Sequence, residues 1–169
     1  VQAGSSGYFI PNSTPFELTG SAIDIDLDSL TYSWEQFDLG PNTHPDTAIG
    51  NCPLFKVNYP LAIPSRIFPK IDDIVTGSYT RGEKLPDYGR LMTFRLMVRD
   101  GHGGVDWDEL HFYTADSLGP FAVTHPNAGW LVWNVGSVQT VTWDIAGSDQ
   151  YPINCQKVDV FLSEDGGYT

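Results

Sequence analysis

The sequence is poor in basic residues and contains no long apolar run. Its 169 residues include 9 lysines and arginines against 21 aspartates and glutamates, which gives a formal net charge of −12. Such a surface repels phosphate backbones and anionic lipid headgroups, so we expect neither nucleic acid nor a membrane surface as a partner. No apolar segment approaches the roughly 20 residues that a membrane-spanning helix needs.

Sequence motifs of the common hydrolases are also absent. There is no Gly-x-Ser-x-Gly turn and no phosphate-binding loop. No two histidines have the i, i+4 spacing of a zinc-protease helix; they are His44, His102, His111 and His125. Two carboxylate pairs are close in sequence, Glu35 with Asp38 and Asp108 with Glu109, but such residues are typical of surface turns. The sequence predicts no enzyme, and a hydrolase without a recognisable motif stays open as an alternative.

Cysteine is scarce, with only Cys52 and Cys155, and they form no Cys-x-x-Cys motif. They are either free thiols or one disulfide that joins the two halves of the chain. An acidic chain with few lysines and many Gly, Asn and Asp residues is typical of extracellular proteins, where a disulfide persists. We therefore expect a secreted or cell-surface protein. No signal peptide is found, so Val1 is expected to open a mature or excised sequence.

Glycine and proline are frequent, with 17 Gly and 12 Pro. These breakers suit short strands joined by turns and leave little room for ordinary helices. Alternation of apolar and polar residues predicts strands at 16–22, 30–37, 90–99, 107–114, 121–124, 138–145 and 158–163. A single helical turn is expected at 71–75. The predicted fold class is therefore all-β.

A small, polar segment around residues 115–120 predicts a domain boundary. We expect an immunoglobulin- or cadherin-like β-sandwich at 1–116, with a long ordered insertion at about 39–85 whose aromatic and aliphatic residues indicate packing. Residues 118–169 are expected to begin a second immunoglobulin-like β-sandwich. This second unit is predicted to be truncated, because about 50 residues fall short of the roughly 100 that such a fold requires.

Carboxylates gather first in the segment 24–28. Asp24, Asp26 and Asp28 alternate with apolar residues, a spacing that directs all three carboxylates to one side of an extended segment. Like charges on one side repel unless a cation lies among them, and Ca²⁺ takes six to eight oxygen ligands. An EF-hand is excluded because the Gly and the later Glu of that loop are missing.

A second acidic segment, residues 100–109, lies between two predicted strands and contains glycines that permit tight turns. If the first and last strands of the first unit are neighbours, both acidic segments meet at one end of the sandwich. The sequence thus predicts a structural Ca²⁺ site formed by Asp24, Asp26, Asp28, Asp100 and Asp106. The alternative is that these residues are ordinary turn formers, because Asp and Gly favour turns on local grounds.

Two sequence blocks resemble a known family. The first has Phe-Glu-Leu-Thr-Gly-Ser-Ala at 16–22, Asp-x-Asp-x-Asp at 24–28 and Leu-Thr-Tyr-x-Trp-Glu-Gln at 30–36. The second has Gly-Glu-Lys-Leu-Pro-x-Tyr at 82–88 and Met-x-Phe-Arg-Leu-x-Val-Arg-Asp at 92–100. Both are similar to the region after the catalytic domain in large secreted bacterial metalloproteases of the reprolysin-like kind. Residues 124–167 resemble a β-sandwich repeat that is common in secreted bacterial proteins.

The resemblance implies a cadherin- or immunoglobulin-like fold and a non-catalytic accessory role, with Asp24, Asp26, Asp28 and Asp100 on matching positions. The zinc motif His-Glu-x-x-His-x-x-Gly-x-x-His of these proteases is absent, so no zinc ligand carries over. The expected function is a calcium-binding extracellular module that spaces or positions a protease. Its expected partners are the parent's catalytic domain, the missing remainder of the second unit, and a protein or glycan ligand.

A carbohydrate-binding or adhesive module is the alternative function. Sugars stack on exposed aromatic rings, and Trp130 and Trp133 lie in a segment without strand periodicity, where exposure is expected. Trp34 and Trp143 lie within predicted strands and are expected in the core.

Overall fold

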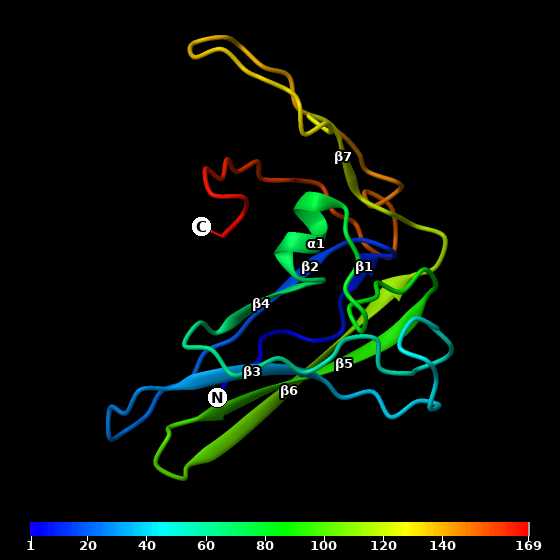
Figure 1. The fold of residues 1–169 in the computed structure, drawn as a ribbon. Coiled ribbons are helices and arrows are strands. Elements are labelled where there is room, and N and C mark those ends of the chain that lie inside the picture. Colours follow the sequence, from blue (N-terminus) through cyan, green and yellow to red (C-terminus); the bar gives the residue numbers. More distant parts are fainter. Residues whose placement is uncertain (169) are drawn as a thin grey trace.

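The computed structural model describes residues 1–168, and strands dominate it (Figure 1). The strands are β1 (Phe9–Pro11), β2 (Phe16–Thr19), β3 (Thr31–Gln36), β4 (Ser65–Phe68), β5 (Arg90–Arg99), β6 (Val105–Ala115), β7 (Ala122–His125) and β8 (Thr142–Asp144). A six-residue helix, α1 (Ile71–Thr76), follows β4. The all-β fold class expected from the sequence is confirmed.

A four-stranded sheet in the order β1-β6-β5-β3 forms the larger layer of a β-sandwich. β5 pairs antiparallel with β6 on one edge and with β3 on the other, while β1 runs parallel to β6 at the margin. β2 and β4 pair antiparallel in a separate two-stranded sheet. Residues of both sheets meet in one hydrophobic core, which makes this part of the chain a β-sandwich.

Strand β5 follows the period-2 pattern along its whole length. Met92, Phe94, Leu96 and Val98 are buried, whereas the residues between them are partly exposed. This alternation is what a strand with one face on the core requires, and the sequence predicted its bounds correctly.

A cluster of phenylalanines joins the two layers. Phe16 of β2 stacks on Phe68 of β4 with ring centroids 5.0 Å apart, and it meets Phe94 of β5 edge-on at 5.7 Å. Phe112 of β6 and Phe55, from the segment between β3 and β4, pack on the same cluster. Aromatic pairs in these geometries each add about 0.5–1.5 kcal/mol beyond the burial of their area.

The segment expected as an ordered insertion, about 39–85, supplies part of the sandwich itself. It contains β4 and α1, and Phe55 and Phe68 within it are buried in the core. Leu54 is buried as well, whereas Tyr59, Leu61 and Ile63 are exposed, which differs from the expected packing. Leu61 instead pairs through its backbone with Tyr32 on the outer edge of β3, with N–H···O distances of 2.7 and 2.9 Å.

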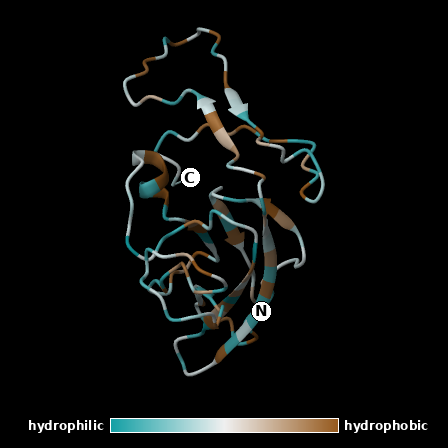
Figure 2. Cartoon of the chain, turned by 90° about the vertical axis from the view of Figure 1, so that its right-hand side faces the viewer, coloured by the Kyte–Doolittle hydropathy of each residue, from teal (hydrophilic) through white to brown (hydrophobic). Residues whose placement is uncertain are grey.

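Residues 118–168 contain a short antiparallel hairpin, β7–β8, beyond which a loop projects from the molecule (Figure 1). Hydrophobic residues also lie along this loop (Figure 2). Ser148 is the one buried residue among the described positions 120–168, and Trp143, which we expected in the core, is 38% exposed. The expected strand at 158–163 is not formed, since no described segment pairs with it. A separate second sandwich stays a prediction.

Phe94→Ala is expected to lower the free energy of unfolding by about 3–5 kcal/mol, because it empties the centre of the phenylalanine cluster. Phe94 is fully buried, whereas Phe161 is 89% exposed, so Phe161→Ala is the matched control and should cost less than about 0.5 kcal/mol. Urea unfolding of the three proteins measures both differences. Equal losses in the two variants would contradict the proposed core.

Candidate functional site

The two acidic segments lie at the same end of the four-stranded sheet. Thr31 of β3 pairs with Arg99 of β5, so the loop that precedes β3 and the turn that follows β5 are neighbours (Figure 1). This convergence comes from β3 pairing with β5; β1 and β6, the first and last strands of residues 1–116, also pair, but at the other margin of the sheet. A hollow of about 240 Å³ lies between the loops, and it is lined by Val1, Ala22, Ile23, Asp24, Leu30, Val98, Asp100, Gly104, Val105 and Asp106.

Asp100 organises the turn between β5 and β6. Its Oδ1 accepts hydrogen bonds from the backbone N–H groups of His102 at 2.7 Å and Gly104 at 2.8 Å. The bond from His102 is the main cause that lowers the pKa of the Asp100 carboxyl, which keeps the group ionised. A Cβ at position 104 would lie 2.2 Å from Asp100 Oδ2, so a side chain there would displace the Asp100 carboxylate.

The segment 24–28 is a turn, which corrects the expectation that it is extended with all three carboxylates on one side. Leu27 has a left-handed φ of 62°, and the Asp28 N–H donates to Asp24 Oδ2 at 2.9 Å. Asp24 therefore lines the hollow, while Asp28 turns to His102, with Oδ2 and Nδ1 3.2 Å apart. Asp26 is exposed and does not line the hollow.

Three of the five expected ligands, Asp24, Asp100 and Asp106, thus surround one hollow. Within residues 1–168, Asp24 Oδ1 and Asp100 Oδ2 accept no hydrogen bond, and Asp106 uses Oδ1 for the Trp107 N–H at 2.9 Å. In the described conformation no three His, Cys, Asp or Glu side chains are grouped closely enough to hold a metal ion. Binding of a cation would require these carboxylates to draw together.

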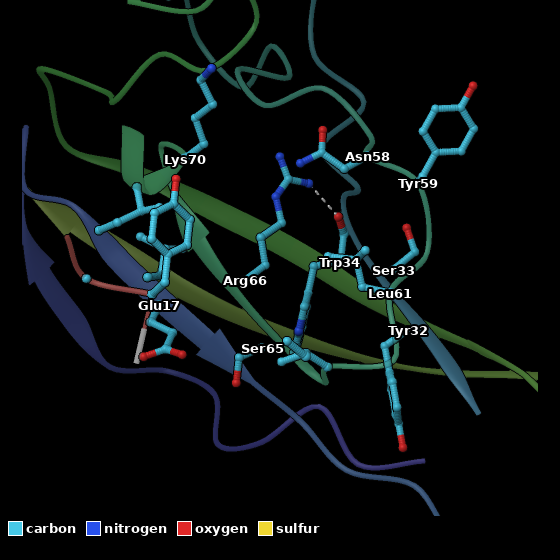
Figure 3. A pocket seen from close by; sticks show the side chains of 15 residues that line it. Glu17, Tyr32, Ser33, Trp34, Asn58, Tyr59, Leu61, Ser65, Arg66 and Lys70 are labelled. Atoms are coloured by element: carbon cyan, nitrogen blue, oxygen red, sulfur yellow. Dashed lines mark hydrogen bonds between the residues drawn. The ribbon is translucent and has the colours of Figure 1, made fainter. Parts of the chain in front are cut away.

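A second feature is a groove of about 310 Å³ along the outer edge of β3 (Figure 3). β3, the arm at 58–63, β4 and the start of α1 form its walls. Tyrosine and aliphatic side chains dominate the lining, which consists of Glu17, Tyr32, Ser33, Trp34, Asn58, Tyr59, Leu61, Ile63, Ser65, Arg66, Ile67, Lys70, Ile71, Gly167 and Tyr168. Sequence analysis missed this groove because no local pattern marks it; it exists only where distant segments pack together.

Arg66 fixes the position of the groove wall. Its guanidinium donates to the Trp34 carbonyl at 2.8 Å, the Lys56 carbonyl at 2.9 Å and Glu83 Oε1 at 2.8 Å (Figure 3). Burial raises the pKa of the Glu83 carboxyl and lowers the pKa of Arg66, while their mutual attraction opposes both shifts. The bond to the Trp34 carbonyl ties β4 to the edge of β3, and the Glu83 pair ties β4 to the segment before β5.

Asp38 is not the surface residue that its sequence context indicated. It is buried, and its Oδ2 lies 3.1 Å from Arg90 Nη2. Burial raises the pKa of the Asp38 carboxyl, and bonds from Gln36, Arg90 and the Thr93 N–H oppose this rise. The ion pair and the bond from the Thr93 N–H hold Asp38 against β5.

The remaining candidate residues are scattered. Trp34 is buried and donates its indole N–H to the Pro64 carbonyl at 2.9 Å, as its strand position predicted. Trp130 and Trp133 are both exposed, as expected for a loop. Cys52 is buried, Cys155 is exposed, and both thiols are free in the structure.

Comparison with known proteins adds no assignment: no family model, no curated protein and no solved structure matches the chain. None of the helices in the described part of the chain is long and apolar enough to cross a membrane.

Gly104→Ala is expected to destabilise the protein by about 1–2 kcal/mol, because the new methyl displaces the Asp100 carboxylate from two backbone donors. Gly129→Ala is the matched control, since nothing lies within 4 Å of a Cβ there. Its effect should be neutral or slightly stabilising. Urea unfolding at pH 7 measures both effects, and the prediction is wrong if the two variants are equally stable.

Proposed function

We propose that this chain is a non-catalytic, calcium-rigidified extracellular module that spaces or positions the catalytic domain of a secreted bacterial metalloprotease. The observation that carries the calcium proposal is the meeting of two acidic loops, distant in sequence, around one hollow. Asp24 comes from one loop and Asp100 and Asp106 from the other. The pairing of β3 with β5 brings the two loops together, and a bound cation would offset the repulsion between carboxylates that this pairing places around one hollow.

A divalent cation would stabilise this arrangement electrostatically. Asp106 Oδ2 lies 3.8 Å from the Val1 ammonium, whereas Asp24 Oδ1 and Asp100 Oδ2 have no hydrogen-bond partner among residues 1–168. A divalent cation between the loops would offset the repulsion of these carboxylates and link the ends of β3 and β5. The unbonded Asp24 Oδ1 and Asp100 Oδ2 are the atoms that we propose as ligands, together with Asp106. Asp28 supports the loop through His102, and Asp26 contributes only to the local negative potential.

The accessory role rests on the resemblance of two sequence blocks to the region after a protease catalytic domain. The exposed apolar side chains of residues 118–168 support the idea that further protein covers this part of the chain. Trp130, Val135, Val138 and Phe161 are among these exposed residues. A partner domain or the remainder of a second sandwich would bury them.

Calcium is expected to raise the midpoint of thermal unfolding. A ligand that binds only the folded state adds about 2.7 kcal/mol at 100 times its dissociation constant, which corresponds to roughly 5–10 °C for a chain of this size. Asp24→Asn combined with Asp100→Asn should abolish the rise. Differential scanning calorimetry with calcium and with a chelator measures it.

Asp87→Asn is the control for loss of a carboxylate away from the hollow, because Asp87 is exposed and lies before β5, at the opposite end of that strand from Asp100. This variant should keep the full calcium response. An unchanged midpoint of the natural sequence in calcium, or an equal loss in the control, would refute the proposal.

A further inference from the structure

We infer that the groove along the edge of β3 binds a neutral oligosaccharide, with one pyranose ring stacked on Tyr59. This site shares no residue with the acidic hollow and does not depend on calcium. It also differs from the loop tryptophans, Trp130 and Trp133, that the sequence offered for sugar binding.

The size and openness of the groove suit a chain-like ligand. Its volume of about 310 Å³ is at the lower end of the roughly 300–1,000 Å³ of small-molecule sites. It lies along a strand edge that is already closed to another strand, because the arm residue Leu61 occupies the backbone groups of Tyr32. A ligand there must therefore be recognised by side chains, not by strand pairing.

Aromatic rings supply the apolar part of the recognition. Tyr59 is 93% exposed, so its ring is open to contact with a ligand. Figure 3 shows Tyr59 and Tyr32 on one side of the groove and Glu17 and Lys70 on the other. One face of a pyranose ring carries C–H groups only, and such a face packs on tyrosine while the hydroxyl groups point sideways to polar partners.

Polar groups with unused hydrogen-bonding capacity lie on both sides of the groove, Asn58 next to Tyr59 and Glu17 opposite (Figure 3). Among the described residues, neither the Asn58 amide nor the Glu17 carboxylate makes a side-chain hydrogen bond, although both line the groove. An amide both donates and accepts, and a carboxylate accepts two hydroxyl donors. Sugar hydroxyls match this set. Proline-rich peptides also bind tyrosine-lined grooves, but proline offers no N–H to the carboxylate.

The charges of the groove favour an uncharged ligand. Arg66 is paired with Glu83 at 2.8 Å, and Lys70 lies 3.8 Å from Asp73, so both cations are already compensated. Glu17 and the net charge of −12 repel anionic polysaccharides. A neutral sugar is not repelled by this negative charge.

Isothermal titration with neutral oligosaccharides of glucose, xylose, mannose and N-acetylglucosamine tests the inference, with a proline-rich peptide as the competing ligand. We expect saturable binding of at least one oligosaccharide. Tyr59→Ala should weaken this binding at least about tenfold, equivalent to 1.4 kcal/mol, whereas Tyr59→Phe keeps the ring and should stay within about threefold.

Tyr151→Ala is the matched control, because Tyr151 is 84% exposed and lies outside the groove. Both tyrosines are exposed, so neither substitution is expected to impair folding, which circular dichroism checks. The inference is overturned if no oligosaccharide binds the folded protein, if only the proline-rich peptide binds, or if Tyr59→Ala and Tyr151→Ala behave alike.

Discussion

The pairing of β5 with a neighbour on each edge is the constraint on which the rest of the structure depends. Burial of Met92, Phe94, Leu96 and Val98 fixes which face of β5 meets the core, and a slip of one residue would expose them all. The register with β3 then sets Thr31 opposite Arg99, which brings the acidic loops together. The same pairing leaves the other edge of β3 outermost, where the groove forms.

How much could be predicted from the sequence depended on whether the signal was local. β5 was predicted with its correct bounds because its alternation extends over 10 residues, and α1 was expected within one residue of its end. β4 gave no comparable signal: four residues among prolines show no clear alternation, and only pairing with β2 makes them a strand. The extended geometry predicted for 24–28 was wrong because Leu27 adopts a positive φ, which is uncommon for leucine and cannot be predicted from the residue type.

In the C-terminal part of the chain, a strand-like segment stays unpaired because no described segment lies beside it as a partner. The segment 158–163 has a strand-like composition but no described partner, and a single strand cannot satisfy its own backbone groups. Trp143 follows the same logic: its place in an alternating pattern predicts burial only if a second layer covers that face. Strand propensity therefore predicted segments that are able to pair, but among the described residues no strand pairs with 158–163.

Charge is arranged in opposite ways at the two sites, and this difference determines the ligand that each can accept. Around the groove, Arg66 and Lys70 are matched by Glu83 and Asp73, so the groove offers an anionic ligand no unpaired cation. At the acidic end, Asp24 and Asp100 keep unbonded oxygens that no nearby lysine or arginine approaches among the described residues. An anionic or neutral ligand would leave that repulsion in place. A cation would offset this repulsion, and a small divalent ion would do so while drawing both loops together, which is why we propose ligands of different chemistry for the two sites.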